Sequence, residues 1–267
     1  MLASSTPDAL WSAPSVRLLR PAAVSCSNVS HGRRLRDISL EVPVGTRLLM
    51  VSEPDASASV LLRVLAGLSR PSRGRIEIAG LADPSIDGWA RRVAYLGPDP
   101  GIHAWMTPRE ALDLAAGLLE LSPAEAAQRT EAVMSWARIP PDAADRPVGR
   151  GGPPLLQRTG LAAALLADPE VVLLDEPLRA LEADERRRLL RLPGGRRTVL
   201  MASRYPASEA GLATHVAYLR GERIALLARL DELEAAGLPL SMRGIAALAD
   251  RRVLSAGGSP GRAAAPR

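Results

Sequence analysis

The sequence predicts an α/β protein in which a mostly parallel sheet is covered on both faces by helices. Short apolar runs that are typical of buried strands alternate with helical patterns along most of the chain, and strands that are apolar on both faces belong to covered parallel sheets. The 267 residues, 47% of them hydrophobic, suffice for one sizeable core. Helical patterns at about 105–150 indicate a helical insertion into this sheet.

The first part of the chain supplies four strand patterns and one helix. The strand patterns share alternating or continuous apolar residues and occupy residues 38–42, 47–51, 75–79 and 92–96. Between the second and the third of them, residues 60–68 have the period of a helix, which Gly67 and the turn after it close. A loop rich in Ser, Pro and Asp separates the second strand from this helix.

Two capping boxes open the helical block. Thr107 and Glu110 form the first, Ser122 and Glu125 form the second, and in each a Pro occupies the first helical position. The helices that they open are expected over about 108–119 and 123–139. After this block the pattern alternates again, with helices expected at 155–167 and 183–192 and strands at 170–174, 198–202 and 215–219.

The two ends of the chain have the composition of disordered segments. Residues 1–20 are polar and broken by Pro, and residues 251–267 end in a Gly/Pro/Ala tail, so we expect a disordered leader and a disordered tail. The leader lacks the apolar stretch of a signal peptide, and the longest apolar segment, 161–167, is far shorter than the roughly 20 residues that span a bilayer. The single Cys26 excludes an intrachain disulfide and suits a reducing cytoplasm.

All 34 basic residues are Arg, because the sequence contains no Lys. The net charge of +5 is compatible with a nucleic acid or an anionic membrane surface as partner. However, the Arg residues are interleaved with acidic ones, and no stripe of aromatic and basic residues is present, which favours a solvated surface and no nucleic-acid partner. One chemical consequence is firm: no lysine ammonium can contact a phosphate in this chain.

The strongest motif is an apolar strand that ends in two carboxylates. Residues 171–174 are Val-Val-Leu-Leu, and Asp175 and Glu176 follow at the carboxyl end, where ligands bind in open α/β sheets. In a phosphate site Asp175 would help to hold Mg²⁺ as a metal ligand, and Glu176 would act as the catalytic residue that orients the attacking water. The alternative is a buried strand that ends in an acidic turn.

Over roughly residues 22–230 the chain resembles the ATP-binding subunit of ABC transporters. Residues 50–67 correspond to that family's strand, P-loop and following helix, and residues 74–78 match the segment after it. Residues 168–177 match the Walker B region, and residues 221–224 resemble the hairpin after the last core strands. Several motifs in the family's order and at its spacing are more specific than any one of them.

The resemblance implies a P-loop NTPase-like, mostly parallel sheet with an antiparallel β subdomain and an inserted α-helical subdomain. It implies ATP and Mg²⁺ as cofactors, a polytopic membrane subunit as partner, and a homodimer or a heterodimer with another ABC subunit. The chain would then be cytoplasmic and peripheral to the cytoplasmic membrane through the membrane subunit. The implied segments are a leader (1–20), the ABC ATPase-like domain (21–228, with the helical insertion at about 105–150), a C-terminal helical extension (229–250) and a tail (251–267).

The P-loop differs from the family pattern G-x-x-G-x-G-K-S/T at most of its functional positions. Ser52, Asp55 and Ser57 stand at the three glycines and Ala58 stands at the lysine, whereas Ser59 keeps the hydroxyl that binds Mg²⁺. The cofactor-binding residues that the resemblance implies in this loop are Ser52, Asp55, Ser57, Ala58, Ser59 and Val60, with Ser59 and Asp175 as metal ligands. Glu53 and Asp55 would add two negative charges beside a bound anion. The lost Lys contact and the added carboxylates together are expected to lower phosphate affinity by about 10²–10⁴.

Further departures lie at the other motifs of the family. Pro98 replaces the Gln that follows the strand at 92–96, and Arg204 replaces the switch His, so that Arg204 would contact a phosphate as a cation. The family's signature L-S-G-G-Q corresponds to Gly149–Leu155 in this chain. Two alignments of this segment with the signature, shifted by one residue, are possible, and in both of them two glycines remain and the Gln is absent. The alternative for this segment is a Gly/Pro loop that caps the following helix. His31 lies near the sequence position at which the family has the aromatic residue that stacks on adenine. The alternative is that His31 is an exposed histidine of a loop.

Three functions remain open from the sequence. The first is an ABC-type subunit that has weakened or lost ATP binding and hydrolysis and that pairs with a membrane component. Trp105 and Met106 are candidate contacts with this component, and the alternative role of both is buried packing. The second is a pseudo-ATPase that acts as a regulatory or interaction module outside a transport cycle. The third is an active ATPase that uses Ser59, Asp175 and Glu176 with Arg204.

Overall fold

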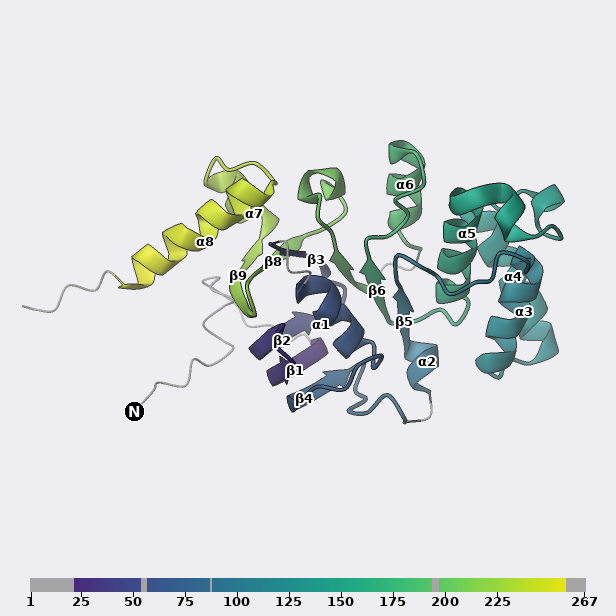
Figure 1. The fold of residues 1–267 in the computed structure, drawn as a ribbon, viewed down its shortest axis with the longest axis horizontal. Coiled ribbons are helices and arrows are strands. Elements are labelled where there is room, and N and C mark those ends of the chain that lie inside the picture. The colour runs from purple at the N-terminus through teal and green to yellow at the C-terminus, as the bar shows by residue number, and fades with distance from the viewer. Residues whose placement is uncertain (1–21, 54–56, 87, 194–196, 258–267) are drawn as a thin grey trace, which may run out of the picture.

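A computed structural model of the chain describes residues 22–53, 57–86, 88–193 and 197–257. Two sheets and a group of helices make up this part of the chain (Figure 1). The larger sheet has the strand order β5-β6-β7-β3-β8-β9, and the smaller sheet has the order β2-β1-β4. The predicted fold class, a mostly parallel sheet with an antiparallel β subdomain and an inserted helical subdomain, is confirmed.

The larger sheet is parallel except at one edge. Its strands are β3 (Arg47–Ser52), β5 (Val93–Leu96), β6 (Val171–Asp175), β7 (Thr198–Ala202), β8 (His215–Arg220) and β9 (Arg223–Arg229). Neighbouring strands from β5 to β8 are parallel, and β9 pairs antiparallel with β8 through a tight hairpin. Every residue of β6 and of β7 is buried, which is the reason that both could be predicted from continuous apolar runs.

The smaller sheet is antiparallel and contains a strand that the sequence patterns missed. Its strands are β1 (Ala22–His31), β2 (Leu35–Pro43) and β4 (Arg73–Ile78), with β1 in the centre. Register shifts interrupt the pairing of β1 with both neighbours. The buried residues of β1 are therefore unevenly spaced, and its sequence shows no regular alternation.

Two apolar layers cover opposite faces of the larger sheet. Helix α1 (Ser57–Leu65) packs with the smaller sheet on one face, where Met50 of β3 belongs to the core. Helices α5 (Val148–Leu165), α6 (Ala183–Leu190), α7 (Leu230–Ala235) and α8 (Met242–Gly257) contribute to the core on the other face, which Val51 of β3 joins. Side chains of successive strand residues alternate between these two layers.

Helix α1 begins and ends three residues before the predicted bounds of 60–68. Its first residues, Ser57 and Ala58, are small and carry no apolar signal, although both are buried. At its end Gly67 has a φ of 76°, and the N–H of Leu68 donates to the carbonyl oxygen of Arg63. Gly67 therefore closes the helix as a left-handed residue, in agreement with the sequence.

The inserted helical block lies beyond β5 at one end of the larger sheet (Figure 1). Helices α3 (Pro108–Leu118) and α4 (Pro123–Ala137) each begin with the predicted capping box, and a 3₁₀ turn (Pro141–Ala143) follows. Helix α5 begins at Val148, not at residue 155, and breaks at Gly152, whose φ of 67° and ψ of −168° are not helical. The short helix α2 (Trp89–Arg92) precedes β5.

The expected disordered tail from residue 251 is wrong for residues 251–257, which continue α8. Arg252 holds this end of the helix, because its guanidinium donates to the carbonyl oxygen of Leu227 at 2.7 Å and pairs with Glu232. These contacts across the fold carry no local sequence signal. The remaining tail residues and the predicted leader lie outside the described residues. Within the described part, no helix is both long and apolar enough to cross a bilayer.

Candidate functional site

The carboxyl ends of β3, β6 and β7 meet at one edge of the larger sheet, where α1 begins. Asp175 ends β6, and Ser59 lies in the first turn of α1. The Ser59 hydroxyl donates to Oδ1 of Asp175 at 2.7 Å across 116 residues of sequence. The structure therefore brings together the two residues that the sequence predicted as metal ligands.

Asp175 is buried among polar partners. Only 4% of its surface is exposed, and this burial raises the pKa of its carboxyl group, against the lowering effect of the hydrogen bonds from Ser59 and Tyr95. The Tyr95 hydroxyl donates to Oδ2 at 3.3 Å, and burial together with the Asp175 charge raises the pKa of Tyr95 to about 12. Sequence reasoning did not select Tyr95, which is one more residue of an apolar strand pattern. The Ser59 and Asp175 oxygens are hard ligands of the kind that Mg²⁺ prefers.

The predicted phosphate loop engages its own polar groups. The N–H of Ala58, at the position of the family's lysine, donates to Oγ of Ser52 at 3.4 Å. The Ser57 hydroxyl donates to the carbonyl oxygen of Gly221 in the β8–β9 hairpin at 2.9 Å. Val60 is half-buried and packs against the core on the α1 face. Asp55 lies outside the described residues. Hydroxyl groups and an N–H that a phosphate would need are thus already paired within the chain.

Glu53, the predicted acidic residue of the phosphate loop, has a hydrogen-bond partner on a distant strand. Its carboxylate accepts a hydrogen bond from the hydroxyl of Tyr218, a fully buried residue of β8. Tyr218 belongs to the apolar layer that contains α8, on the face opposite α1. The Glu53 carboxylate is therefore bonded to Tyr218, and its place beside a bound anion stays a prediction.

Glu176 is held by two arginines. Its Oε1 accepts from the backbone N–H of Arg204 at 2.6 Å and lies 3.3 Å from Nε of the same residue, and its Oε2 lies 2.9 Å from Nε of Arg179. The side chain of Glu176 is 10% exposed. Its φ of 48° is left-handed, a conformation that costs a non-glycine residue about 1–2 kcal/mol. Glu176 and Arg204 were both predicted as site residues, but the contact between them was not predicted, and neither was Arg179.

A buried acid continues this network. Glu209 is fully buried, and its Oε1 lies 3.0 Å from Nη2 of Arg179, pairs with Arg186 and accepts from the Ser203 hydroxyl at 2.9 Å. Arg186 is itself 5% exposed and donates through Nε to the carbonyl oxygen of Pro177. The turns after β6 and after β7 are therefore cross-linked by guanidinium groups behind the predicted catalytic carboxylate.

The remaining predicted residues lie at the margin of this site or away from it. The side chain of Arg204 is 76% exposed. Nδ1 of His31 lies 2.9 Å from the carbonyl oxygen of Arg70, in the turn beyond the carboxyl end of α1, so its role at adenine stays a prediction. Met106 is 8% exposed, as packing requires, but Trp105 is 68% exposed and stacks on His103, so the alternative of burial is wrong for Trp105.

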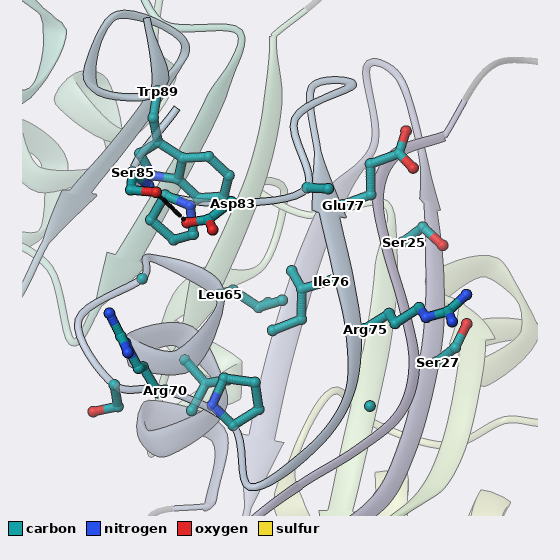
Figure 2. A pocket seen from close by; sticks show the side chains of 17 residues that line it. Ser25, Ser27, Leu65, Arg70, Arg75, Ile76, Glu77, Asp83, Ser85 and Trp89 are labelled. Carbon is teal, nitrogen blue, oxygen red and sulfur yellow. Dashed lines mark hydrogen bonds between the residues drawn. The ribbon is translucent and has the colours of Figure 1, made fainter. Parts of the chain in front are cut away.

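A cleft of about 840 Å³ lies apart from the phosphate loop (Figure 2). Strands β1 and β4 form one wall, and the carboxyl end of α1 with the loop at 82–85 forms the other. The Asp83 carboxylate on this loop accepts from the N–H and the hydroxyl of Ser85, both at 2.8 Å, and these bonds lower its pKa. Ser57 and Ser59 begin α1 at its other end, so the cleft is separate from the site built around Asp175.

Comparison with known proteins agrees with this geometry. The family model described as ABC transporter matches residues 35–179, which include the phosphate loop, Asp175 and Glu176. The chain is 32% identical over 209 residues to the aliphatic sulfonates import ATP-binding protein of Corynebacterium glutamicum, covering 75% of this chain and 81% of that protein. It is 31% identical over 206 residues to an uncharacterized ABC transporter ATP-binding protein of Nostoc, with 74% of this chain covered. The chain spans 61% of the length of that relative.

The solved structures show the same architecture. An ATP-binding subunit of an ABC transporter superposes with a TM-score of 0.74 at 22% sequence identity, covering 85% of this chain and 99% of that one. At this identity the match establishes the fold alone. The family model covers more than half of the chain, and the Corynebacterium protein is matched over most of its length. The chain therefore belongs to the ABC transporter family and has the fold of its ATP-binding subunits.

Proposed function

We propose that the chain is the ATP-binding-cassette-type subunit of an ABC transporter that has lost ATP hydrolysis and binds ATP weakly. The observation that carries the proposal is the pairing of Glu176 with Arg179 and Arg204. Both carboxylate oxygens face guanidinium or N–H donors. A carboxylate that is paired in this way has few lone pairs left to orient a water.

The residues of the site fit Mg²⁺ better than they fit a triphosphate. Ser59 and Asp175 supply two adjacent oxygens for a cation. The loop offers no lysine, and the N–H of Ala58 and the hydroxyl of Ser57 are bonded within the chain. The start of α1 still supplies a helix dipole for an anion, which supports weak binding and not tight binding.

Exposed apolar side chains in the helical block support docking to a membrane subunit. Trp105 lies in the loop after β5, and Leu114 and Leu118 lie one turn apart on α3, with exposed fractions of 68%, 56% and 76%. Large apolar side chains that remain exposed together mark interaction sites. Through this contact the chain would lie at the cytoplasmic face of the membrane, paired there with a second copy or with another ABC subunit.

The test is ATP turnover by the purified full chain with Mg²⁺, compared with its Glu176→Gln variant. The proposal expects no turnover above that of the variant, and a fluorescent ATP analogue that binds only at high micromolar concentration or above. Glu234→Gln, on the exposed side of α7, is the matched control. Turnover by the wild type that Glu176→Gln lowers 100-fold or more, with the control unchanged, would establish an active ATPase and refute the proposal.

A further inference from the structure

The outer edge of β4 carries unpaired backbone groups where it borders the cleft of Figure 2. The N–H of Ala79 donates to the carbonyl oxygen of Ala23 on β1. Successive residues direct their backbone groups to alternate sides of a strand, so those of Ile78 and Ile76 point to the outer edge. At Ile78 they bond with Leu81, in both directions, at 2.9 and 2.8 Å. Those of Ile76 have no partner in the described part of the chain.

The opposite wall of the cleft is fixed by a close contact between the end of α1 and the loop that carries Pro84. A Cβ atom added at Gly67 would lie 2.4 Å from Cγ of Pro84, so only a glycine lets the loop approach this closely. Between this wall and β4, the apolar residues Leu65, Ile76 and Trp89 are among those that line the cleft. Its volume of about 840 Å³ falls within the roughly 300–1,000 Å³ of ligand pockets.

The two faces of β4 differ in their chemistry. Ile76 packs against the core on the α1 face, whereas its neighbour Arg75 lies opposite Ser27 of β1 on the other face. In Figure 2 the Arg75 side chain extends toward Ser27 and away from Leu65. Arg75 is exposed, and its guanidinium has no hydrogen-bond or ion-pair partner among the residues that the structure describes. A strand added at this edge would therefore meet an apolar surface on one face and an unpaired cation on the other.

We propose that the cleft binds an extended peptide segment of another protein, which adds to the edge of β4 at Ile76. The segment runs antiparallel to β4, as Leu81 does at the neighbouring edge position. Its central residue exchanges two backbone hydrogen bonds with Ile76 and places an apolar side chain beside Leu65 and Trp89. The next residue toward its carboxyl end lies opposite Arg75, where a carboxylate is favoured. The cleft thus selects an apolar residue that is followed by an acidic one.

A single strand suits this cleft better than the sheet edge of a second copy of the chain. If two β4 edges paired, each copy would bring its own β1 behind its β4, toward the opposite wall at Gly67 and Pro84. A lone segment needs room for one strand only. The cleft is also separate from the site around Asp175, so the proposal requires neither binding nor hydrolysis of ATP.

The first test uses the full chain and a peptide of sequence Thr-Thr-Leu-Glu-Thr-Thr with an N-terminal dansyl group, whose fluorescence anisotropy reports binding. Saturable binding with a dissociation constant of about 100 µM or below is expected. Methylation of the leucine nitrogen removes the N–H that bonds to Ile76 and should weaken binding about tenfold or more. Methylation of the glutamate nitrogen, whose N–H points away from β4, is the matched control and should leave the affinity within about twofold.

The side-chain preference is tested with Arg75→Gln. This variant should bind the glutamate peptide about threefold more weakly than the wild type does, the size of an exposed ion pair, and should bind the peptide with Gln in place of Glu equally well. Arg187→Gln, at an exposed position on α6, is the matched control and should bind as the wild type does. Absence of saturable binding up to about 1 mM peptide, or equal losses from the two methylated peptides, would overturn the proposal.

Amide hydrogen exchange, followed by NMR, reports on the edge itself. The N–H of Ile76 should exchange rapidly in the free protein and about tenfold or more slowly when the peptide is bound. The N–H of Glu77, which is directed toward β1, should be protected in both states. Protection of Ile76 that rises with protein concentration in the absence of peptide would show a second copy at the edge and refute the proposal. Unchanged exchange at Ile76 on peptide binding would place the peptide elsewhere and refute it as well.

Discussion

The Nε atom of Arg179 lies 2.9 Å from Oε2 of Glu176, while its Nη2 atom lies 3.0 Å from Oε1 of the fully buried Glu209. One guanidinium thus serves a carboxylate of the candidate site and a carboxylate of the core. The first of these contacts occupies one carboxylate oxygen of Glu176. The second makes Arg179 part of the packing of the protein, with consequences for stability.

Replacement of Arg179 by Ala is expected to destabilise the fold. The change removes one of the two guanidinium partners of Glu209 and leaves a buried charge with poorer compensation, which costs about 2–3 kcal/mol. Urea denaturation would measure the free energy of unfolding. Arg187→Ala, at an exposed position on α6, is the control and should change it by less than about 0.5 kcal/mol. Equal small effects of both changes would contradict the role of Arg179.

The carboxyl group of Asp175 makes the folded state less stable as the pH rises. Burial raises its pKa above the ordinary value of 3.8, so the folded state binds the proton more tightly than the unfolded state does. The free energy of unfolding therefore falls between pH 3.8 and the raised pKa. Asp175→Asn removes this titration and should become more stable relative to the wild type between pH 4 and pH 7. Thermal melts of the wild type and the variant at pH 4 and pH 7 measure this change. If the stability of the variant relative to the wild type stays constant or falls from pH 4 to pH 7, the expectation is contradicted.

The ion pair between Arg220 and Asp250 is expected to contribute little to global stability. Its side chains are 43% and 59% exposed, and exposed pairs contribute about 0.2–1 kcal/mol. Asp250→Ala should therefore change the melting temperature only slightly, while amide hydrogen exchange in the last turns of α8 increases. Asp184→Ala, at an exposed position on α6, should leave that exchange unchanged. Unchanged exchange in the Asp250→Ala variant would show that the pair does not hold the helix.

A charge on the exposed face of α3 is expected to release the protein from the membrane. Leu118 is 76% exposed, so Leu118→Glu should leave the free energy of unfolding within about 0.5 kcal/mol of the wild type. In lysates of the native host, the tagged wild type should sediment with membranes and the variant should remain in the supernatant. Val253→Glu, at an exposed apolar position on α8, is the control. Equal sedimentation of all three proteins would contradict docking through α3.

Local sequence patterns predicted the helices and strands that are marked by a run of apolar residues or by a capping box. Continuous apolar runs identified β6 and β7, and the capping boxes at Thr107 and Ser122 identified two helix starts. The bulged strand β1 and the small residues that begin α1 were missed, since neither shows a regular apolar period. Both failures concern places where tertiary packing, and not the hydrophobic pattern, decides the conformation.

Only those residues of the candidate site that belong to the family's motifs could be predicted from the sequence. The order of the motifs led to Ser59 and Asp175 as metal ligands and to Glu176 and Arg204 as further site residues. Ser59 and Asp175 are in contact, and the backbone N–H of Arg204 donates to Glu176. The contacts of Tyr218 with Glu53, and of Arg179 with Glu209, join residues on different elements. No periodicity or spacing in the sequence indicates which distant side chain a polar group will select, so these partners required the structure.

The buried Glu209 limits the order in which the residues of this network can be substituted. Arg179 is one of the two arginines that hold Glu176, and its loss also leaves Glu209 with one guanidinium instead of two. Substitution of Arg179 alone is therefore expected to lower the stability of the fold, unless Glu209 is replaced first. The network thus couples the candidate site to the core, so that stability sets the order in which Arg179 and Glu209 can be exchanged.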